Sequence, residues 1–567
     1  MPLAWLIGQL QGLFQALEQR VMATAIGLGL VLPLPATVYL LRRRSRAEPR
    51  DVALLLMIGA AIVLCAIWLY VNVDAILFPA DILTWSESDF VNDIIKFRIG
   101  YPLYTDQRNN DSFVYPPGAQ LLTYAISVLI GKSQSIPAYR LIQLVYVFVA
   151  VVIAADCASR ISRMSGTLDA GRQGSLWGLL GFPVLFLAGT NALTNPFTHN
   201  LHNDALALAT CALGYWVLLR YADSRGWLWL GAMVVLPAVG FVVKQSLLVW
   251  LALFGLHLAI FDRPRSWRRV VFVVVGGGAL VAAVVAAGYW LWGEPFRYWI
   301  FTVLAGSGVS VLRSFRHLIT VWPYVAVGLV AGWGLLRGEG ASRLAGPWLV
   351  WLLLTLTEVF SSGIAWMTNH IGPGSLLAAC WLLALLHRVW ASLIGRARTA
   401  ARGRAWFRAA VVVAALLLLF GGLGFIRVPL PAIPQEAYRY VAEIEQQFAA
   451  GSPATTLLDV GSWVYLPHGI VMKDRGPCMG DRGYGGTGDF GGILERLHKR
   501  YYRKILIRRL HSPDFWYDHY LWPNSSGIRK ALLSNYREVG KIAPGWPVTP
   551  DSPAPYLLDE ISILVPK

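Results

Sequence analysis

Two carboxylates separated by one residue stand at the start of the first long polar segment of the chain. Glu87 and Asp89 belong to the stretch Asp81-Ile-Leu-Thr-Trp-Ser-Glu-Ser-Asp-Phe90, just beyond an apolar run. A carboxylate beside aromatic residues, in a partly desolvated loop, can act as a general base. The alternative is that both acids are solvated loop side chains. The segment continues through Tyr104 and Tyr115, which are candidates for contacts with a sugar or an acceptor.

A few basic residues lie apart from the arginine-rich connections described below, and they are candidates for holding a phosphate. Lys244 follows an apolar run, where an unpaired lysine is costly, and Arg297 follows Glu294-Pro-Phe. Arg313 and Arg316 precede a later apolar run. The alternative for each is snorkelling of the side chain to lipid headgroups.

A second polar segment contains His202, Asn203 and Asp204, which are expected to orient a sugar or acceptor or to assist the base. Capping of the following helix by Asn203 or Asp204 is an equal alternative. His370 is a further candidate for the sugar pocket, with an ordinary loop histidine as the alternative. No third ligand completes a metal set with these histidines, so no metal site is predicted.

The composition shows what kind of scaffold must hold these residues. The 567 residues are 56% hydrophobic and 14% charged, with a mean hydropathy of +0.52. Soluble domains are closer to half apolar and a quarter charged, so a polytopic membrane protein is indicated. The net charge of +17 resides largely in short arginine runs between apolar stretches. That pattern is typical of cytoplasmic loops and argues against nucleic-acid binding.

Apolar runs long enough to cross a bilayer, about 20 residues each, occur about twelve times. They are expected at 21–41, 52–74, 137–158, 175–193, 204–220, 227–243, 246–262, 270–291, 317–336, 345–364, 371–390 and 409–426. Placing the arginine-rich connections in the cytoplasm puts both termini and the candidate residues outside the cell membrane.

Three regions follow from this topology. Residues 1–20 are predicted to form an interfacial amphipathic helix, and 21–426 a transmembrane domain. Within it, 75–136 is a large first external loop, whose apolar run at 118–131 is expected on the membrane surface. Residues 427–567 are predicted to form an extracytoplasmic α/β domain. Its expected helices lie near 434–450, 489–501 and 526–534, and its strands at 455–460, 503–508 and 558–565.

The first external loop resembles that of GT-C glycosyltransferases, which are multi-span enzymes that use polyprenyl-phosphate sugars. The resemblance rests on Glu87-Ser-Asp89-Phe90, Gly100-Tyr-Pro-Leu-Tyr104 and Tyr115-Pro-Pro-Gly118. The spacing is most similar to bacterial polyprenyl-phosphate-mannose-dependent mannosyltransferases (glycosyltransferase family 87 and its relatives). The resemblance implies a GT-C fold and a site at the outer membrane face. Asp89 best matches the catalytic base, with Glu87 as the alternative.

The expected function is inverting transfer of a sugar from a polyprenyl-phosphate donor to an envelope glycan, lipid or protein. Mannose is favoured by the resemblance, and a pentose such as arabinofuranose is the alternative. No cofactor is required, because lysine and arginine can stabilise a leaving phosphate; a divalent cation, Mg²⁺ or Mn²⁺, at Glu87 and Asp89 is the alternative. The expected location is the plasma (inner) membrane. A secondary transporter or lipid flippase and an oligosaccharide ligase using a diphosphate-linked donor are the rival functions.

Overall fold

The computed structural model describes residues 49–567 with several gaps. The gaps are 85, 167–171, 191–199, 263, 307, 339, 364–367, 397–432, 460, 477, 480–481, 483–489, 514, 516–525 and 545–558. The interfacial helix expected at 1–20 and the spans expected at 21–41 and 409–426 lie outside the described residues.

Each of the other expected spans coincides with a helix, because long apolar runs satisfy their backbone groups internally as helices. These helices are α3 (Pro49–Leu77), α6 (Ile136–Met164), α7 (Arg172–Gly189), α8 (Asp204–Ser224), α9 (Trp227–Val243), α10 (Val249–Phe261), α11 (Trp267–Arg297), α13 (Val311–Leu336), α14 (Ala341–Ser361) and α15 (Gly372–Arg396). Within the described residues, five helices are long and apolar enough to cross a membrane, or six if the bent α13 counts as one span. The chain is therefore a helical membrane protein.

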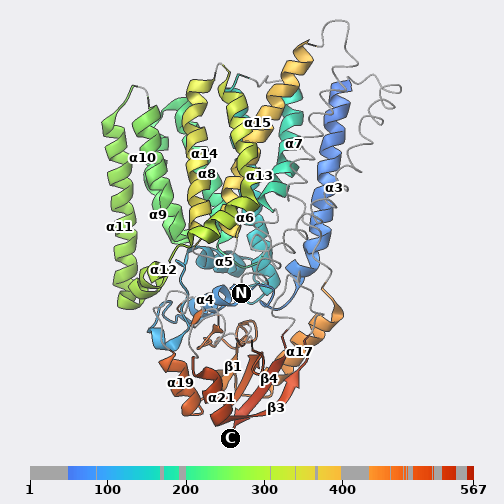
Figure 1. Cartoon of the computed structure of the whole chain (residues 1–567), viewed down its shortest axis with the longest axis vertical. Helices are drawn as coiled ribbons and strands as arrows, with labels where there is room; N and C mark the ends of the chain where they lie inside the picture. The colour runs from blue at the N-terminus through green and yellow to red at the C-terminus, as the bar shows by residue number, and fades with distance from the viewer. Residues whose placement is uncertain are drawn as a thin grey trace.

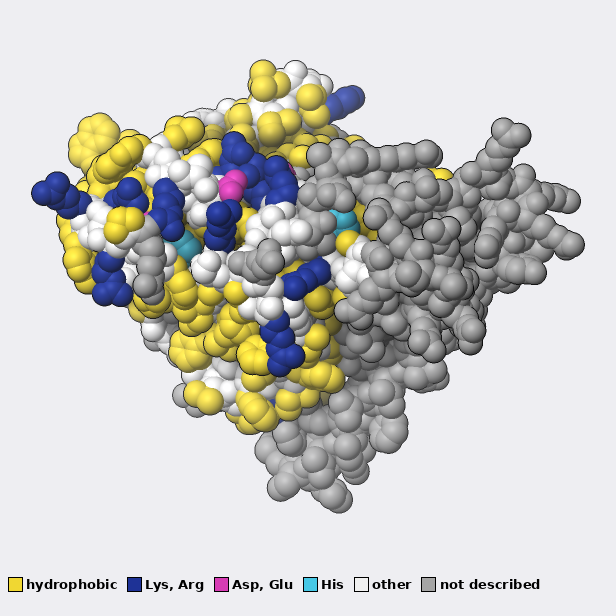
Figure 2. Space-filling model, turned by 90° about the horizontal axis from the view of Figure 1, so that it is seen from above, with side chains coloured by type: hydrophobic (Ala, Val, Ile, Leu, Met, Phe, Trp, Pro, Cys, Tyr) yellow, Lys and Arg dark blue, Asp and Glu magenta, His cyan; other side chains and the backbone are white. Residues whose placement is uncertain are grey.

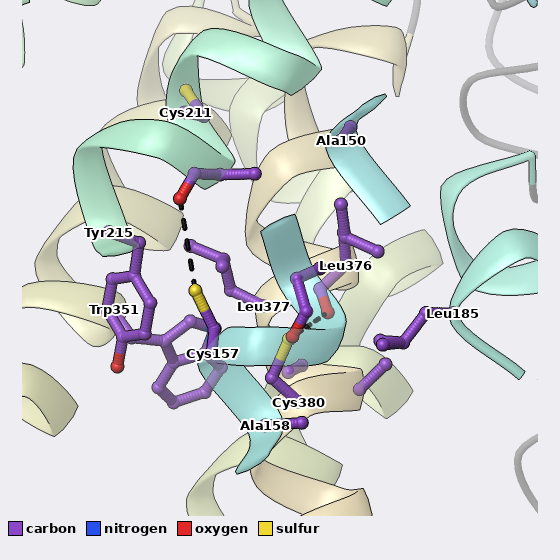
Figure 3. Close-up of a cluster of buried hydrophobic side chains, with 14 of the residues drawn as sticks. Ala150, Cys157, Ala158, Leu185, Cys211, Tyr215, Trp351, Leu376, Leu377 and Cys380 are labelled. Atoms are coloured by element: carbon purple, nitrogen blue, oxygen red, sulfur yellow. Dashed lines mark hydrogen bonds between the residues drawn. The ribbon is translucent and has the colours of Figure 1, made fainter. Parts of the chain in front are cut away.

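Small side chains let the central helices approach closely. α6 packs along α8 through alanines and Cys157, and Cys380 of α15 donates its thiol to the carbonyl of Ala154 (3.4 Å). Figure 3 shows these cysteines among the buried side chains of α6, α8 and α15. On the outside of the bundle, large apolar side chains such as Trp290 of α11 (84% exposed) face outward, as expected for contact with lipid.

The first loop and the C-terminal region lie together at one end of the bundle (Figure 1). Two helices of the loop, α4 (Glu87–Ile99) and α5 (Gly118–Leu129), lie across this end, and α5 corresponds to the apolar run expected at 118–131. The described part of the helical region also contains the short segments η1 (Gln107–Asn109), η2 (Gln245–Leu248), η3 (Tyr298–Thr302), α12 (Val303–Gly306) and η4 (Thr368–Ile371). The opposite end carries a group of lysine and arginine side chains (Figure 2).

The C-terminal region is a small α/β unit built on a mixed sheet. It contains α17 (Gln435–Ala449), β1 (Thr456–Leu458), α19 (Gly491–His498), β2 (Lys504–Arg508), α21 (Ile528–Asn535), β3 (Tyr536–Ile542) and β4 (Ile561–Pro566). The strand order is β1-β2-β4-β3, with β1 parallel to β2 and the other pairs antiparallel. The expected helices and strands are confirmed. The sequence analysis missed β3, an edge strand whose middle residues are mostly polar and exposed.

Candidate active site

The helix that carries both candidate acids begins and ends for clear local reasons. Glu87 and Asp89 occupy the first turn of α4, where the positive end of the helix dipole favours carboxylates. Gly100 ends the helix in the left-handed conformation (φ 69°), which glycine adopts without strain. All of Glu87 to Lys96 is buried. The loop acids are thus interior groups, and the reading of both as solvated side chains does not describe them.

Glu87 is held by an arginine that the sequence analysis did not select. Arg140 of α6 donates from Nε to one oxygen of Glu87 (2.8 Å) and from Nη2 to the other (2.6 Å). The backbone N–H of Leu201 also donates to Glu87 (3.0 Å). The remaining donors of Arg140 reach the backbone carbonyls that link α3 to α4: Ala75, Phe78 and Ala80. Glu87 therefore fixes the start of α4 to α6.

Asp89 points to the C-terminal region. Its carboxylate forms an ion pair with Arg475, and neither side chain is more than 1% exposed. Arg475 also donates from Nη1 to the carbonyl of Ser88 (3.2 Å). Unlike Glu87, Asp89 is paired with a residue from outside the helical bundle.

A second polar cluster gathers at the same end of the bundle. The Nζ atom of Lys244, which follows α9, lies 2.5 Å from one oxygen of Asp204, the first residue of α8. The other oxygen of Asp204 lies 3.0 Å from His202 Nδ1 and accepts a hydrogen bond from Asn369 Nδ2. All four side chains are less than 10% exposed. We call Asp204, Lys244, His202 and Asn369 the lysine cluster.

Asn203 contributes to this end of the bundle without capping α8. Its side-chain amide lies 3.5 Å from the carbonyl of Val243 at the end of α9, and it makes no capping hydrogen bond. The amide links the start of α8 to the end of α9, and the capping alternative for Asn203 does not hold here.

Aromatic rings join the two groups. Phe90, next to Asp89, meets the ring of His202 edge-on (4.9 Å between centroids) and stacks on Tyr115 (5.9 Å). The Lys244 ammonium lies 5.9 Å from the centre of the Tyr115 ring. Tyr104 is buried, and its hydroxyl donates to the carbonyl of Tyr115 (2.8 Å). Phe90 thus links the turn of α4 that carries Asp89 to His202 of the lysine cluster.

The other predicted residues lie outside the lysine cluster and differ in how far their side chains are exposed. His370 of η4 interacts electrostatically with Lys244 and Asp204. Arg313 is half-buried at the start of α13 and donates from Nη1 to the carbonyl of Gly363 (3.2 Å); Arg316 is one turn further along and also half-buried. Arg297 is 62% exposed and pairs with Glu294 on its own helix. Of the four predicted phosphate-binding cations, Lys244 alone belongs to the lysine cluster.

The sequence analysis missed three participants. Arg140 lies inside an apolar span, and Asn369 stands beside the selected His370 in the same short segment. The isolated charge of Arg140 in an apolar helix was a usable signal, because such a charge needs a partner. Arg475 lies in the C-terminal region, and no feature of its local sequence marks it.

A divalent cation at Glu87 and Asp89 was the alternative expected from the sequence. Each of these carboxylates is neutralised by its own arginine. Within the part of the chain that the structure describes, no group of three or more histidine, cysteine, aspartate or glutamate side chains is arranged to hold a metal ion.

Comparison with known proteins identifies the fold. No family model matches the sequence, and neither does any curated protein. Among solved structures, the chain is similar to ArnT from Cupriavidus metallidurans bound to undecaprenyl phosphate, with a TM-score of 0.55, 16% identity and coverage of 89% of this chain and 98% of ArnT. For ArnT in the apo state the TM-score is 0.50 at 16% identity, with coverage of 89% and 97%.

A more distant likeness is to the oligosaccharyltransferase of Archaeoglobus fulgidus, with a TM-score of 0.45, 9% identity and coverage of 80% of this chain and 69% of that one. The nearly full-length match to ArnT shows that the chain has the GT-C fold, a helical membrane bundle followed by a small extramembrane unit that contains a sheet.

Proposed function

We propose that this GT-C chain is an integral-membrane inverting glycosyltransferase. It transfers a sugar from a polyprenyl-phosphate donor to an envelope glycan, lipid or protein at the outer face of the plasma membrane. One observation carries the proposal: Phe90, the residue after Asp89 on α4, packs against His202 of the lysine cluster at the loop end of the bundle. We assign the base for the acceptor to Asp89 and the cation for the leaving phosphate to Lys244, in the two groups that this contact joins.

Asp89 is the proposed base. It accepts the proton of an acceptor hydroxyl while that oxygen forms a bond to the anomeric carbon of the donor sugar. The bond from the anomeric carbon to the phosphate oxygen breaks, and polyprenyl phosphate leaves with the electron pair on its oxygen. Attack opposite the leaving group inverts the anomeric carbon. Glu87 is less suited to this role, because Arg140 and the Leu201 N–H occupy its oxygens.

Lys244 is the proposed principal contact of the donor phosphate. An ammonium has three donors, and the contact with Asp204 uses one of them. A buried cation stabilises the charge of a leaving phosphate more strongly than an exposed one. Arg313 and Arg316, at the start of α13, are proposed to assist where the lipid enters. The structure of ArnT with undecaprenyl phosphate supports a polyprenyl-phosphate ligand for this fold.

We propose that the sugar and acceptor pocket is lined by Tyr104, Tyr115, Asn203, Asp204, His202 and His370, and that the sugar is mannose.

The transporter or flippase alternative fits the arrangement less well. A transporter places ionisable groups near the middle of the membrane, whereas Asp204 and Lys244 lie where α8 begins and α9 ends, at the loop end of the bundle.

The test is sugar transfer by the purified protein from a panel of donors. The panel contains polyprenyl-phosphate mannose, a polyprenyl-phosphate pentose and a diphosphate-linked oligosaccharide, each with envelope extract as acceptor. Transfer from a monophosphate donor supports the proposal, and the product identifies the sugar. Transfer from the diphosphate donor alone would indicate a ligase. Movement of a labelled lipid across proteoliposomes without transfer would indicate a flippase.

A further inference from the structure

Residues 461–475 of the C-terminal region close over the first half of α4. The hydroxyl of Ser462 donates to the carbonyl of Ser88 (2.9 Å), and the backbone N–H of Met472 donates to the side-chain oxygen of Asn92 (3.0 Å). Arg475 adds its contacts with Ser88 and Asp89. The turn that carries the proposed base is therefore covered by a segment from the far end of the sequence.

We propose that Arg475 is a positioning residue of the active site: it holds the Asp89 carboxylate ionised and in place, and it withdraws when the acceptor hydroxyl binds. This inference rests on the function proposed above. It gives the C-terminal region a part in positioning the proposed base.

Ionisation of Asp89 depends on this arginine. Asp89 has no exposed surface, and burying a carboxylate without a counter-ion favours its neutral form. Neighbouring cations offer no replacement, because they already have carboxylate partners: Arg140 pairs with Glu87, Lys244 with Asp204, Lys96 with Asp111 and Arg496 with Asp474. Among the neighbouring acids, Asp93 accepts from Gln120, and Asp81 accepts from the backbone of Ser462 and Trp463.

Withdrawal follows from the geometry of proton transfer. A general base must come within hydrogen-bonding distance of the hydroxyl that it deprotonates, and the guanidinium of Arg475 occupies the Asp89 carboxylate. The backbone of Arg475 is fixed, since its N–H donates to the carbonyl of Asn110 (3.2 Å) and that of Asp474 donates to Asn109 (3.1 Å). A rotation of the Arg475 side chain would therefore free an oxygen of the Asp89 carboxylate while the backbone of Asp474 and Arg475 stays in place.

The test measures kcat/KM against pH for Arg475→Gln, Arg475→Lys and the wild type. With Gln, the acid limb moves to higher pH by about one unit or more, because the carboxylate has lost its counter-ion. Above that limb the variant is at least as active as the wild type, since no guanidinium has to be displaced. With Lys, the limb stays near its wild-type position. Arg108→Gln is the matched control, because it removes an exposed ion pair between the same two regions and leaves Asp89 untouched.

A second comparison separates positioning from folding. Arg475→Gln leaves a buried charge unpaired and lowers the melting temperature, whereas the double variant Asp89→Asn/Arg475→Gln recovers part of that loss. A pH profile of Arg475→Gln that overlays the wild type, or an equal loss of activity at every pH, would overturn the inference. If the wild type transfers no sugar, or Asp89→Asn is fully active, the proposed function or base is wrong, independently of Arg475.

Discussion

Arg140 donates to both carboxylate oxygens of Glu87 from a fully buried position in α6. This pair distinguishes two acids that look alike in the sequence. Glu87 is engaged by α6 and the loop backbone, whereas Asp89 meets a single residue of the C-terminal region. The structure therefore favours a structural role for Glu87 and supports Asp89 as the proposed base.

Glu87→Ala is expected to destabilise the protein strongly. It leaves the Arg140 guanidinium buried without its carboxylate, a change that costs about 3–5 kcal/mol in comparable buried pairs. Thermal unfolding of the purified protein in detergent measures the effect. Glu294→Ala is the matched control, since it breaks an exposed pair with Arg297 and should leave the melting temperature unchanged. A Glu87→Ala protein of normal stability but without activity would instead make Glu87 the base.

Lys244→Met is expected to weaken donor binding. A charged hydrogen bond to phosphate contributes about 1.5–3 kcal/mol, so the Kd for a polyprenyl phosphate should rise roughly tenfold to a hundredfold. Binding of a fluorescent polyprenyl phosphate measures this, with Lys244→Arg expected to retain most of the affinity. Arg297→Gln is the control and should bind normally, because Arg297 is exposed and already paired with Glu294. Equal losses for Lys244→Met and Arg297→Gln would refute the assignment of Lys244 as the principal contact.

The protein is expected to lose folding stability as pH rises from about 4 through 7. Burial raises the pKa of Asp81 to about 7, and burial likewise raises the pKa of Asp93 to about 7. Both groups bind protons more tightly in the folded state, so their stabilising contribution is complete below about pH 4 and is lost as pH rises through 7.

Asp81→Asn should therefore flatten the fall in melting temperature between pH 5 and pH 8, although Asp93 still contributes. Asn keeps a side-chain oxygen that can accept from the Ser462 and Trp463 N–H groups that contact Asp81. A wild-type melting temperature that rises over this range would contradict the prediction, and so would a variant curve parallel to the wild type.

Gly461→Ala is expected to loosen the contact between the first loop and the C-terminal region. A Cβ atom at Gly461 would lie 2.5 Å from an oxygen of Asp81 and 2.6 Å from the ring of Trp463, so the segment must shift. Faster hydrogen exchange at the backbone N–H of Met472, together with a lower melting temperature, measures the change. Gly278→Ala is the control, because no atom lies within 4 Å of a Cβ there. Unchanged exchange in Gly461→Ala would show that the contact tolerates the added atom.

The bundle could be predicted from the sequence because each helix is a long apolar run with an arginine-rich connection at one end, and such runs have few alternatives in a membrane. The sheet was harder to predict from the sequence. β3 is an edge strand that pairs with β4 alone, so most of its middle residues are exposed and apolar residues do not alternate along it. Within the site, the acids and aromatic residues that lie close together in the sequence could be identified as candidates. Contacts such as Asp89 with Arg475 depend on how two distant regions dock, and no local pattern encodes that.

The most direct test of the central claim is single-turnover sugar transfer by Asp89→Asn, compared with the wild type on the best donor of the panel. The proposal predicts a loss of about 10²–10⁴-fold in rate, as expected when a general base is removed. Donor affinity should stay close to that of the wild type, because Lys244 is unchanged. The melting temperature should fall, because Asp89→Asn leaves Arg475 buried without its carboxylate. Transfer by Asp89→Asn at the wild-type rate would contradict the proposed base and the mechanism built on it.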